Sequence, residues 1–154
     1  MIAYLSGAME NAPEMGSSWR NDVTEWLKKD FNHTVINPVL ESKKIIKNTN
    51  SKNYKEWKYT DPKKYKQLMR NFIDKDLKLI VEKADYLIVL WDDSVIKGGG
   101  THGEATIAYY KNIPIFLVNN MQNYEISGWI FSCATEVYDS FDELKVDFIK
   151  RFKE

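Results

Sequence analysis

Short apolar runs alternate along the chain with longer segments in which apolar residues recur at helical spacing. The apolar runs are candidate strands, at Ile2–Leu5, His33–Asn37, Asp85–Trp91, Ile113–Val118 and Ala134–Tyr138. Helical spacing and capping residues predict helices from Ser17 or Ser18 to about Lys29, from Pro62 (after the cap Asp61) to about Lys83, from Thr101 to about Lys111, and after the cap Ser140.

This alternation predicts an α/β fold. We expect a flavodoxin-like, doubly wound parallel sheet of five strands in the order 2-1-3-4-5, with helices on both faces. Ligands bind such sheets beyond the carboxyl ends of the strands, near the switch point between strands 1 and 3. Three loops reach that point, at Ser6–Arg20, Asp92–Glu104 and Asn119–Trp129.

The chain is of a length that suits one domain, residues 1–154, and it shows no internal repeat. A connection rich in lysine and asparagine, at about 39–65, falls outside the predicted elements. Three interpretations fit it: a patch for anions or nucleic acid, a solvated helical face plus a loop, or a mobile flap over an active site.

Charge is distributed unevenly. Lys plus Arg and Asp plus Glu both number 22, so the formal net charge is zero, yet residues 41–70 carry ten basic and three acidic side chains, a net charge of +7. Residues 1–40 and 71–154 carry net charges of −2 and −5. Because dedicated nucleic-acid binders usually have an overall basic excess, we expect no nucleic-acid polymer as a partner.

The single cysteine, Cys133, excludes an internal disulfide and a four-cysteine metal site. The N-terminus has no basic region followed by a long apolar run, and no apolar stretch approaches ~18 residues. We therefore expect a cytoplasmic protein without membrane contact. Nothing in the sequence implies a metal or an organic cofactor.

Candidate chemistry is concentrated after the third predicted strand, in WDDSVIKGGGTHGE. Its glycines let the backbone turn tightly and approach a ligand closely, and a helix N-terminus follows them. Glu104 would lie in the first helical turn, where we expect its pKa to be held down, and an ionised carboxylate can attack the C1 atom of a sugar. Thr101 to Glu104 also fits a capping box, which needs no function, and His102 reads as an exposed histidine of that turn.

Four segments together resemble the nucleoside 2-deoxyribosyltransferase family in its broad sense, which includes related hydrolases of nucleoside 5′-monophosphates. They are YLSGAM, DKDLKLIVEKADYLIVLWD, GGGTHGEATIAYYKNIPIFLV and ISGWIFSCATEVYDSFDEL. The resemblance covers about two thirds of the chain, in the order of the family, and fails over roughly 39–65.

The resemblance implies catalytic roles for three residues. Glu104 matches the nucleophilic glutamate of the family, and Asp76 matches an aspartate that carries the proton and orients the sugar. Tyr4 matches a tyrosine that hydrogen-bonds the nucleophile. Without the resemblance, Asp76 reads as one of several charges near the end of a lysine-rich helix, and Tyr4 as a core aromatic residue.

The resemblance also implies substrate contacts. Ser6, Gly7 and Met9 would line the sugar pocket, Gly100 and Thr101 would contact the substrate, and Asp92 or Asp93 would face the base. Ser127 falls where the monophosphate hydrolases hold a phosphate, in a segment, Asn119–Cys133, that we expect to serve a neighbouring subunit. Arg20, with Ser17 and Ser18 at the start of the first helix, fits either a 5′-phosphate site or helix capping beside a surface arginine.

These features predict an enzyme that cleaves the N-glycosidic bond of a (deoxy)ribonucleoside through a covalent glycosyl-enzyme and transfers the deoxyribosyl group to another base. One alternative is hydrolysis of (deoxy)nucleoside 5′-monophosphates to the free base, and another is a non-catalytic nucleotide-binding module. The expected partners are a small-molecule nucleoside or nucleotide and further copies of the chain, in a homo-oligomer with shared active sites.

Overall fold

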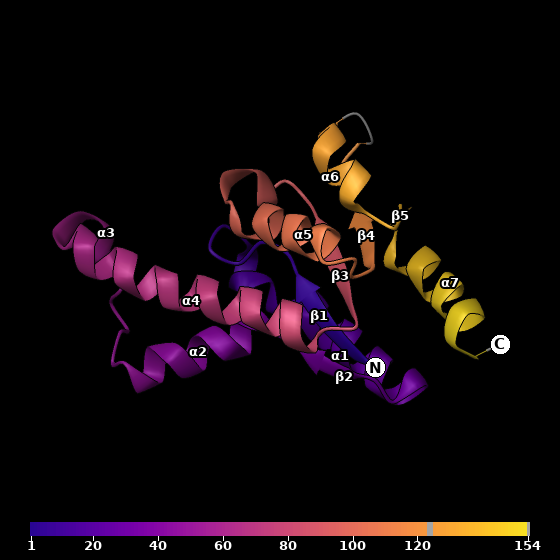
Figure 1. Ribbon diagram of the computed structural model, residues 1–154, viewed down its shortest axis with the longest axis horizontal. Coiled ribbons are helices and arrows are strands. Elements are labelled where there is room, and N and C mark those ends of the chain that lie inside the picture. Colours follow the sequence, from indigo (N-terminus) through magenta and orange to yellow (C-terminus); the bar gives the residue numbers. More distant parts are fainter. Residues whose placement is uncertain (123–124, 154) are drawn as a thin grey trace.

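Five parallel strands form a single sheet in the computed structural model, which describes residues 1–122 and 125–153. The strands are β1 (Ile2–Ser6), β2 (Thr34–Ile36), β3 (Tyr86–Trp91), β4 (Ile115–Asn119) and β5 (Glu136–Tyr138). They pair in the order β2-β1-β3-β4-β5, which confirms the predicted flavodoxin-like α/β topology (Figure 1).

Helices lie on both faces of this sheet. They are α1 (Ser17–Phe31), α2 (Pro38–Asn48), α3 (Trp57–Thr60), α4 (Pro62–Lys83), α5 (Gly100–Tyr110), α6 (Gly128–Cys133) and α7 (Phe141–Lys153), with short 3-10 turns η1 (Pro13–Gly16) and η2 (Val95–Lys97). No helix in the described part of the chain is long and apolar enough to cross a membrane.

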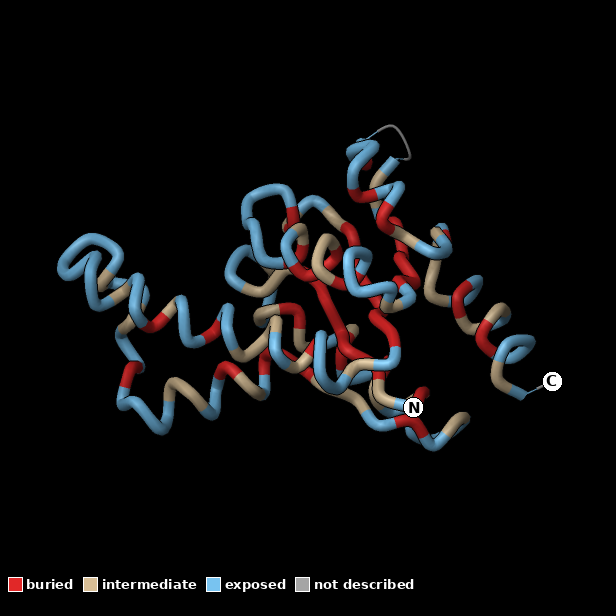
Figure 2. Tube along the Cα trace, viewed as in Figure 1, coloured by how far each residue is buried: buried red, intermediate tan, exposed pale blue. Residues whose placement is uncertain are grey.

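The core consists of two layers because side chains of the central strands alternate between the faces. Leu87 and Val89 of β3 pack with Ile80 of α4 and with α5 and α6. Ile88, between them, packs on the opposite face against α1 and α7, where Phe148 is fully buried. Figure 2 shows the buried residues concentrated in the strands. Burial on both faces explains the continuous apolar run at this strand.

Two predicted helix starts are confirmed and one is wrong. The Asp61 carboxylate accepts a hydrogen bond from a backbone N–H of α4, and the Ser140 hydroxyl accepts one from a backbone N–H of α7. The predicted cap of α1 by Ser17 or Ser18 does not form. The preceding residue, Gly16, has φ 68 instead, and this left-handed conformation lets the backbone enter the helix without a side-chain cap.

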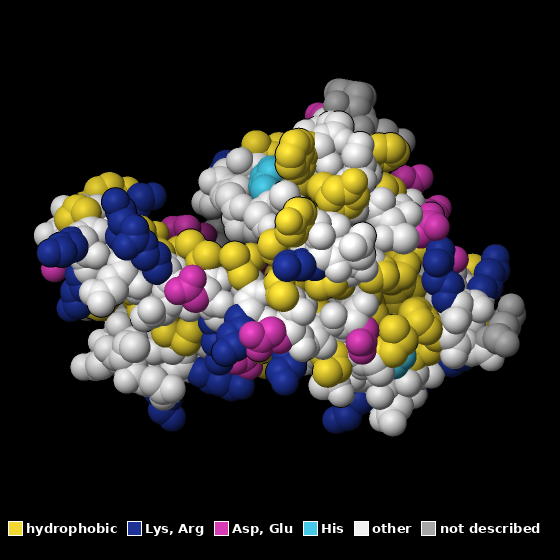
Figure 3. Space-filling view, in the orientation of Figure 1, with side chains coloured by type: hydrophobic (Ala, Val, Ile, Leu, Met, Phe, Trp, Pro, Cys, Tyr) yellow, Lys and Arg dark blue, Asp and Glu magenta, His cyan; other side chains and the backbone are white. Residues whose placement is uncertain are grey.

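The lysine-rich segment is largely helical. Pro38 ends the extended chain after β2 but also begins α2, and the Asn37 side chain caps that helix by accepting a hydrogen bond from the Val39 N–H. Figure 1 shows α2, α3 and the first part of α4 extending away from the sheet. We call residues 38–70 the helical arm. Its ten basic side chains are all exposed. Figure 3 shows Lys and Arg side chains along the face of the arm that is in view.

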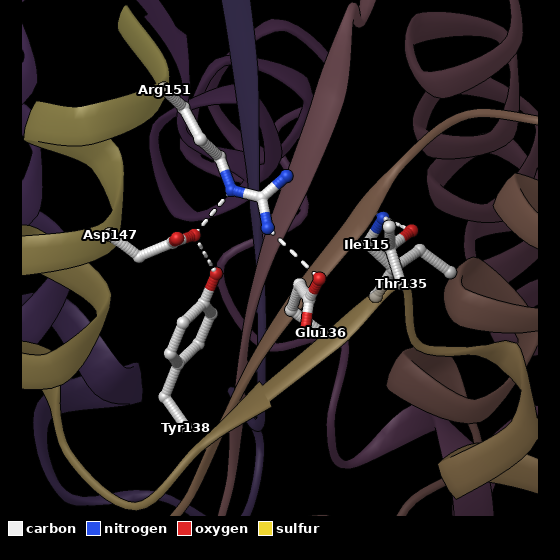
Figure 4. Close-up of polar contacts among 6 residues, drawn as sticks. All are labelled: Ile115, Thr135, Glu136, Tyr138, Asp147 and Arg151. Atoms are coloured by element: carbon white, nitrogen blue, oxygen red, sulfur yellow. Dashed lines mark hydrogen bonds and ion pairs between the residues drawn. The ribbon is translucent and has the colours of Figure 1, made fainter. Parts of the chain in front are cut away.

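The edge strand β5 is joined to α7 by a polar network (Figure 4). The Tyr138 hydroxyl donates a 2.6 Å hydrogen bond to Asp147, and Arg151 pairs with both Asp147 and Glu136, the latter at 2.9 Å. The Thr135 hydroxyl accepts a 2.9 Å hydrogen bond from a backbone N–H of β4. Exposed ion pairs add little stability, so their main effect is to fix where α7 lies on the sheet.

Candidate active site

Glu104 is buried at the carboxyl end of β1, although it belongs to α5. The Tyr4 hydroxyl donates a 2.8 Å hydrogen bond to its Oε1, and the Ser6 hydroxyl donates to its Oε2. Only 9% of Glu104 is exposed. The alternative interpretation as a capping box with Thr101 is wrong, because α5 begins one residue earlier than predicted, at Gly100, and has no side-chain cap.

The electrostatics of Glu104 differ from the prediction. Burial raises the pKa of this carboxyl, while hydrogen bonds from Ser6 and Tyr4 and the positive charge of Arg20 act to lower it. The expected lowering by the helix N-terminus is therefore wrong: Glu104 lies beyond the first turn, and the loss of water outweighs helix-end stabilisation. The two hydroxyl donors partly replace the lost water.

Asp76, on α4, lies in the same cavity as Glu104. Its pKa is raised to about 7, mostly by burial and also by the negative charges of Glu104 and Glu41, against smaller opposing effects of Tyr4 and Lys75. Both carboxyl groups therefore have raised pKa values, and the hydrogen bonds from two hydroxyl groups favour the charged form of Glu104.

The cavity has a volume of about 240 Å³ and lies between α4, the loop after β1 and the segment that precedes α5. It is lined by Gly7, Ala8, Met9, Glu10, Asn11, Met15, Ser42, Tyr54, Met69, Phe72, Ile73, Asp76, Ser94, Val95, Gly98, Gly99, Gly100, Thr101 and Glu104. All of its charged side chains are acidic, namely Glu10, Asp76 and Glu104.

Arg20 does not take the predicted place of a phosphate ligand. Its side chain is 0% exposed, and its guanidinium donates hydrogen bonds to five backbone carbonyls. These carbonyls belong to Leu5, Gly7, Ala8, Met15 and Gly16. Arg20 therefore holds the loop after β1 in shape and contributes a buried positive charge behind Glu104.

Four other predicted contacts, Ser6, Asp92, Asp93 and Ser127, lie outside the cavity lining. Ser6 was predicted to line the sugar pocket, but its hydroxyl donates to Glu104 instead. The Asp92 carboxylate accepts a 2.9 Å hydrogen bond from the Ser94 N–H in a local turn, and Asp93 is exposed. Ser127 caps α6 by accepting a hydrogen bond from the Ile130 N–H. In the segment predicted to serve a neighbour, residues 123 and 124 lie outside the described residues.

The structure thus brings Asp76 and Glu104 together with Gly7, Met9, Gly100 and Thr101, while Tyr4 and Ser6 hold Glu104 from behind. Sequence reasoning missed most of the apolar wall. Met69, Phe72 and Ile73 precede Asp76 by seven, four and three positions, so helical spacing alone places them on its face of α4. Glu10, Asn11, Ser42 and Tyr54 carry no comparable signal, since they come from a loop and from the arm.

Described residues 1–122 and 125–153 contain no cluster of three or more His, Cys, Asp or Glu side chains that could hold a metal ion. No family model matches the chain, and no curated protein matches it in sequence. One solved structure, a 2-deoxyribosyltransferase from the psychrotolerant bacterium Bacillus psychrosaccharolyticus, superposes with a TM-score of 0.57 over 94% of this chain and 90% of that chain, at 16% sequence identity.

The chain has the fold of a 2-deoxyribosyltransferase. The resemblance noted in the sequence is therefore confirmed at the level of the fold. At 16% identity, the superposition shows a shared fold and does not show a shared activity.

Proposed function

We propose that the protein cleaves the N-glycosidic bond of a (2-deoxy)ribonucleoside and transfers the deoxyribosyl group to another base. The observation that carries this proposal is the pairing in one cavity of Glu104, held by two hydroxyl donors, with Asp76, whose pKa is raised to about 7. The fold shared with a solved 2-deoxyribosyltransferase supports it.

In the first step, an oxygen of ionised Glu104 attacks C1′ of the sugar. The C–O bond to the carboxylate forms, the C1′–N bond breaks, and its electron pair leaves with the base. Protonated Asp76 transfers its proton to the departing base and becomes a carboxylate. The hydrogen bonds from Tyr4 and Ser6 leave lone pairs of Glu104 free for the attack, because each carboxylate oxygen accepts more than one hydrogen bond.

In the second step, a ring nitrogen of the incoming base attacks C1′ of the glycosyl-enzyme. The ester bond to Glu104 breaks and its electrons return to the carboxylate, while the Asp76 carboxylate takes up the proton that the base loses. Both carboxyl groups then regain their starting states. Water in place of the second base would give hydrolysis by the same steps.

The charges around the cavity favour a free nucleoside over a 5′-monophosphate. Its described lining has three acidic side chains and no Lys, Arg or His, and the nearby Arg20 donates all its hydrogen bonds to backbone carbonyls. A phosphate dianion in this cavity would meet like charges, and the described lining offers it no cationic side chain. We therefore place hydrolysis of 5′-monophosphates second.

The decisive test is chromatography of products from a panel of deoxynucleosides and their 5′-monophosphates, with and without an acceptor base. We expect a new nucleoside to form in the presence of the acceptor, and Glu104→Ala to form none while keeping the circular dichroism of a folded protein. An unchanged rate in Glu104→Ala would contradict the mechanism. Binding without turnover in the wild type would favour the non-catalytic module.

We also propose that a second copy of the chain docks on the apolar surface of α5 and α6. Leu77, Ile107, Tyr110 and Trp129 line a groove there, and Trp129 is 68% exposed. Figure 3 shows hydrophobic side chains gathered over these helices. The groove adjoins the segment bearing Ser127, which does not line the cavity of its own chain. Light scattering should give a dimer or larger species, and a monomer at working concentration would contradict this arrangement.

A further inference from the structure

The cavity has one aromatic corner. Among the described residues that line it, only Tyr54 and Phe72 carry aromatic rings, and these two rings pack in a T-shaped arrangement with centroids 5.7 Å apart. The loop after β1 adds the apolar side chains of Met9 and Met15, which are not flat. Flat heterocycles bind by stacking on aromatic side chains, whereas a deoxyribose has hydroxyl groups and no such ring. The corner is therefore the part of the cavity whose chemistry suits a nucleobase.

This corner lies next to Asp76. Phe72 precedes Asp76 by four positions on α4, so both side chains lie on one face of the helix, about 6 Å apart along its axis. In the proposed reaction, C1′ of the sugar lies against Glu104 and Asp76 gives its proton to the departing base. A base that lies against Asp76 is within reach of the Phe72 and Tyr54 rings.

Tyr54 belongs to the helical arm, and several contacts fix its ring. Its backbone N–H donates a 3.1 Å hydrogen bond to the Ser51 carbonyl, and its own carbonyl accepts one of 3.1 Å from the Trp57 N–H. Its ring stacks on that of Tyr65, with centroids 6.4 Å apart and an angle of 11° between the planes. Tyr65 does not line the cavity, so of these two rings it is that of Tyr54 that a ligand meets. Because the ring is already held before a ligand binds, ordering it adds little to the entropy cost of binding.

We propose that Tyr54 is a base-binding residue, on whose ring the nucleobase of the substrate packs beside Phe72. The proposal rests on the proposed function for the place of the sugar, whereas the aromatic corner itself does not depend on turnover. It gives a binding role to the arm, within the region 39–65 over which the family resemblance fails. Because every base has a flat face, we expect Tyr54 to add affinity for purines and pyrimidines alike.

Titration calorimetry with free adenine tests this contact without turnover. Loss of one stacking contact with an aromatic side chain corresponds to about tenfold or more in affinity. We expect the Kd for adenine to rise by that factor in Tyr54→Leu, which keeps an apolar side chain against Phe72 but has no flat ring. Tyr54→Phe keeps the ring and should bind adenine as the wild type does. An unchanged Kd in Tyr54→Leu would overturn the proposal, and so would a wild type that does not bind adenine at millimolar concentration.

Tyr59→Leu is the matched control, because Tyr59 lies on the same arm, is 83% exposed and does not line the cavity. It should bind adenine as the wild type does. NMR of the wild type is a second measurement that needs no folded variant. Addition of adenine should shift the ring-proton resonances of Tyr54 and leave those of Tyr59 unchanged. Unshifted Tyr54 resonances in the adenine-bound protein would overturn the proposal.

Steady-state kinetics separate a binding role from a general disturbance of the site. A base contact made equally before and during the reaction changes KM, so Tyr54→Leu should raise KM for deoxynucleosides about tenfold and leave kcat within about twofold. A fall in kcat with an unchanged KM would overturn the role in binding. Product formation together with wild-type adenine affinity in Tyr54→Leu would contradict the role of Tyr54 alone. Adenine binding through Tyr54 without any product would contradict the proposed function alone.

Discussion

The hydroxyl of Tyr4, in the inner strand β1, donates a 2.8 Å hydrogen bond to Oε1 of Glu104, a residue 100 positions later in the chain. This contact stabilises the ionised form of a carboxyl group whose burial disfavours ionisation. A residue of the sheet therefore helps to set the pKa of the proposed nucleophile.

Removing this donor should shift the acid limb of the pH profile. In Tyr4→Phe, Glu104 loses a hydrogen bond to its charged form, so its pKa rises and a higher pH is needed to ionise it. We expect kcat/KM at neutral pH to fall about tenfold, with the acid limb displaced upward. Steady-state kinetics across pH 4–9 would measure both. Tyr86→Phe is the control, since Tyr86 is also buried but contacts His33 on the other face of the sheet. Superimposable profiles for Tyr4→Phe and the wild type would argue against this role.

The proton on Asp76 should set the alkaline limb. With a pKa raised to about 7, Asp76 loses its proton as the pH rises through neutrality, and the leaving base then departs without an acid. We expect kcat/KM to decrease about tenfold per pH unit well above pH 7. In Asp76→Asn we expect kcat/KM to be low at every pH and not to decrease further above pH 7. Asp74→Asn, an exposed neighbour on α4 outside the cavity, should behave as the wild type. An alkaline limb that persists in Asp76→Asn would show that another group carries the proton.

The same pKa has a consequence for stability. An acid whose pKa is higher in the folded protein than the ordinary 3.8 imposes no penalty below pH about 4; its cost grows as the pH rises to about 7 and is complete above that. The full difference between the two pKa values corresponds to up to about 4 kcal/mol in the free energy of unfolding. Asp76→Asn should therefore be more stable than the wild type at pH 8, by an amount that shrinks toward pH 4. Urea unfolding at both pH values measures it, and an equal gain at both would contradict the titration argument.

Arg20 should be important for folding rather than for phosphate binding. Replacing it with methionine leaves the carbonyls of the loop after β1 without a donor, so we expect a loss of about 3–5 kcal/mol in the free energy of unfolding. Arg70→Met, at an exposed position on the arm, should change it by less than about 0.5 kcal/mol. The discriminating measurement is unfolding with and without phosphate. A loss of phosphate affinity without a loss of stability would restore the predicted role.

The fold could be predicted largely because its signals are local. The apolar run of β3 is visible in six consecutive residues, and the start of α4 in the adjacent pair Asp61-Pro62. The helix α2 was missed because its lysine-rich sequence reads as a solvated connection, and α6 because it is short. Both helices are also short, at 11 and 6 residues.

The site could be predicted only in part because its contacts are between distant segments. The resemblance pointed to Glu104, Asp76 and Tyr4, and the structure places them around one cavity. Spacing alone suggested a capping box and a lowered pKa for Glu104, and both were wrong because tertiary burial determines where the side chain lies. In sequence, Arg20 fits either a phosphate site or a surface position, whereas in the structure it donates hydrogen bonds to five carbonyls of a folded loop.

The glycines from Gly98 to Gly100 are not required by the local structure. Gly98 and Gly99 have φ of −125 and −105, which any residue can adopt, and a Cβ at Gly99 or Gly100 would contact nothing within 4 Å. These positions line the cavity, yet neither backbone conformation nor packing requires glycine there. A larger residue at Gly99 or Gly100 would therefore change the shape of the cavity without straining the backbone or crowding a neighbouring atom.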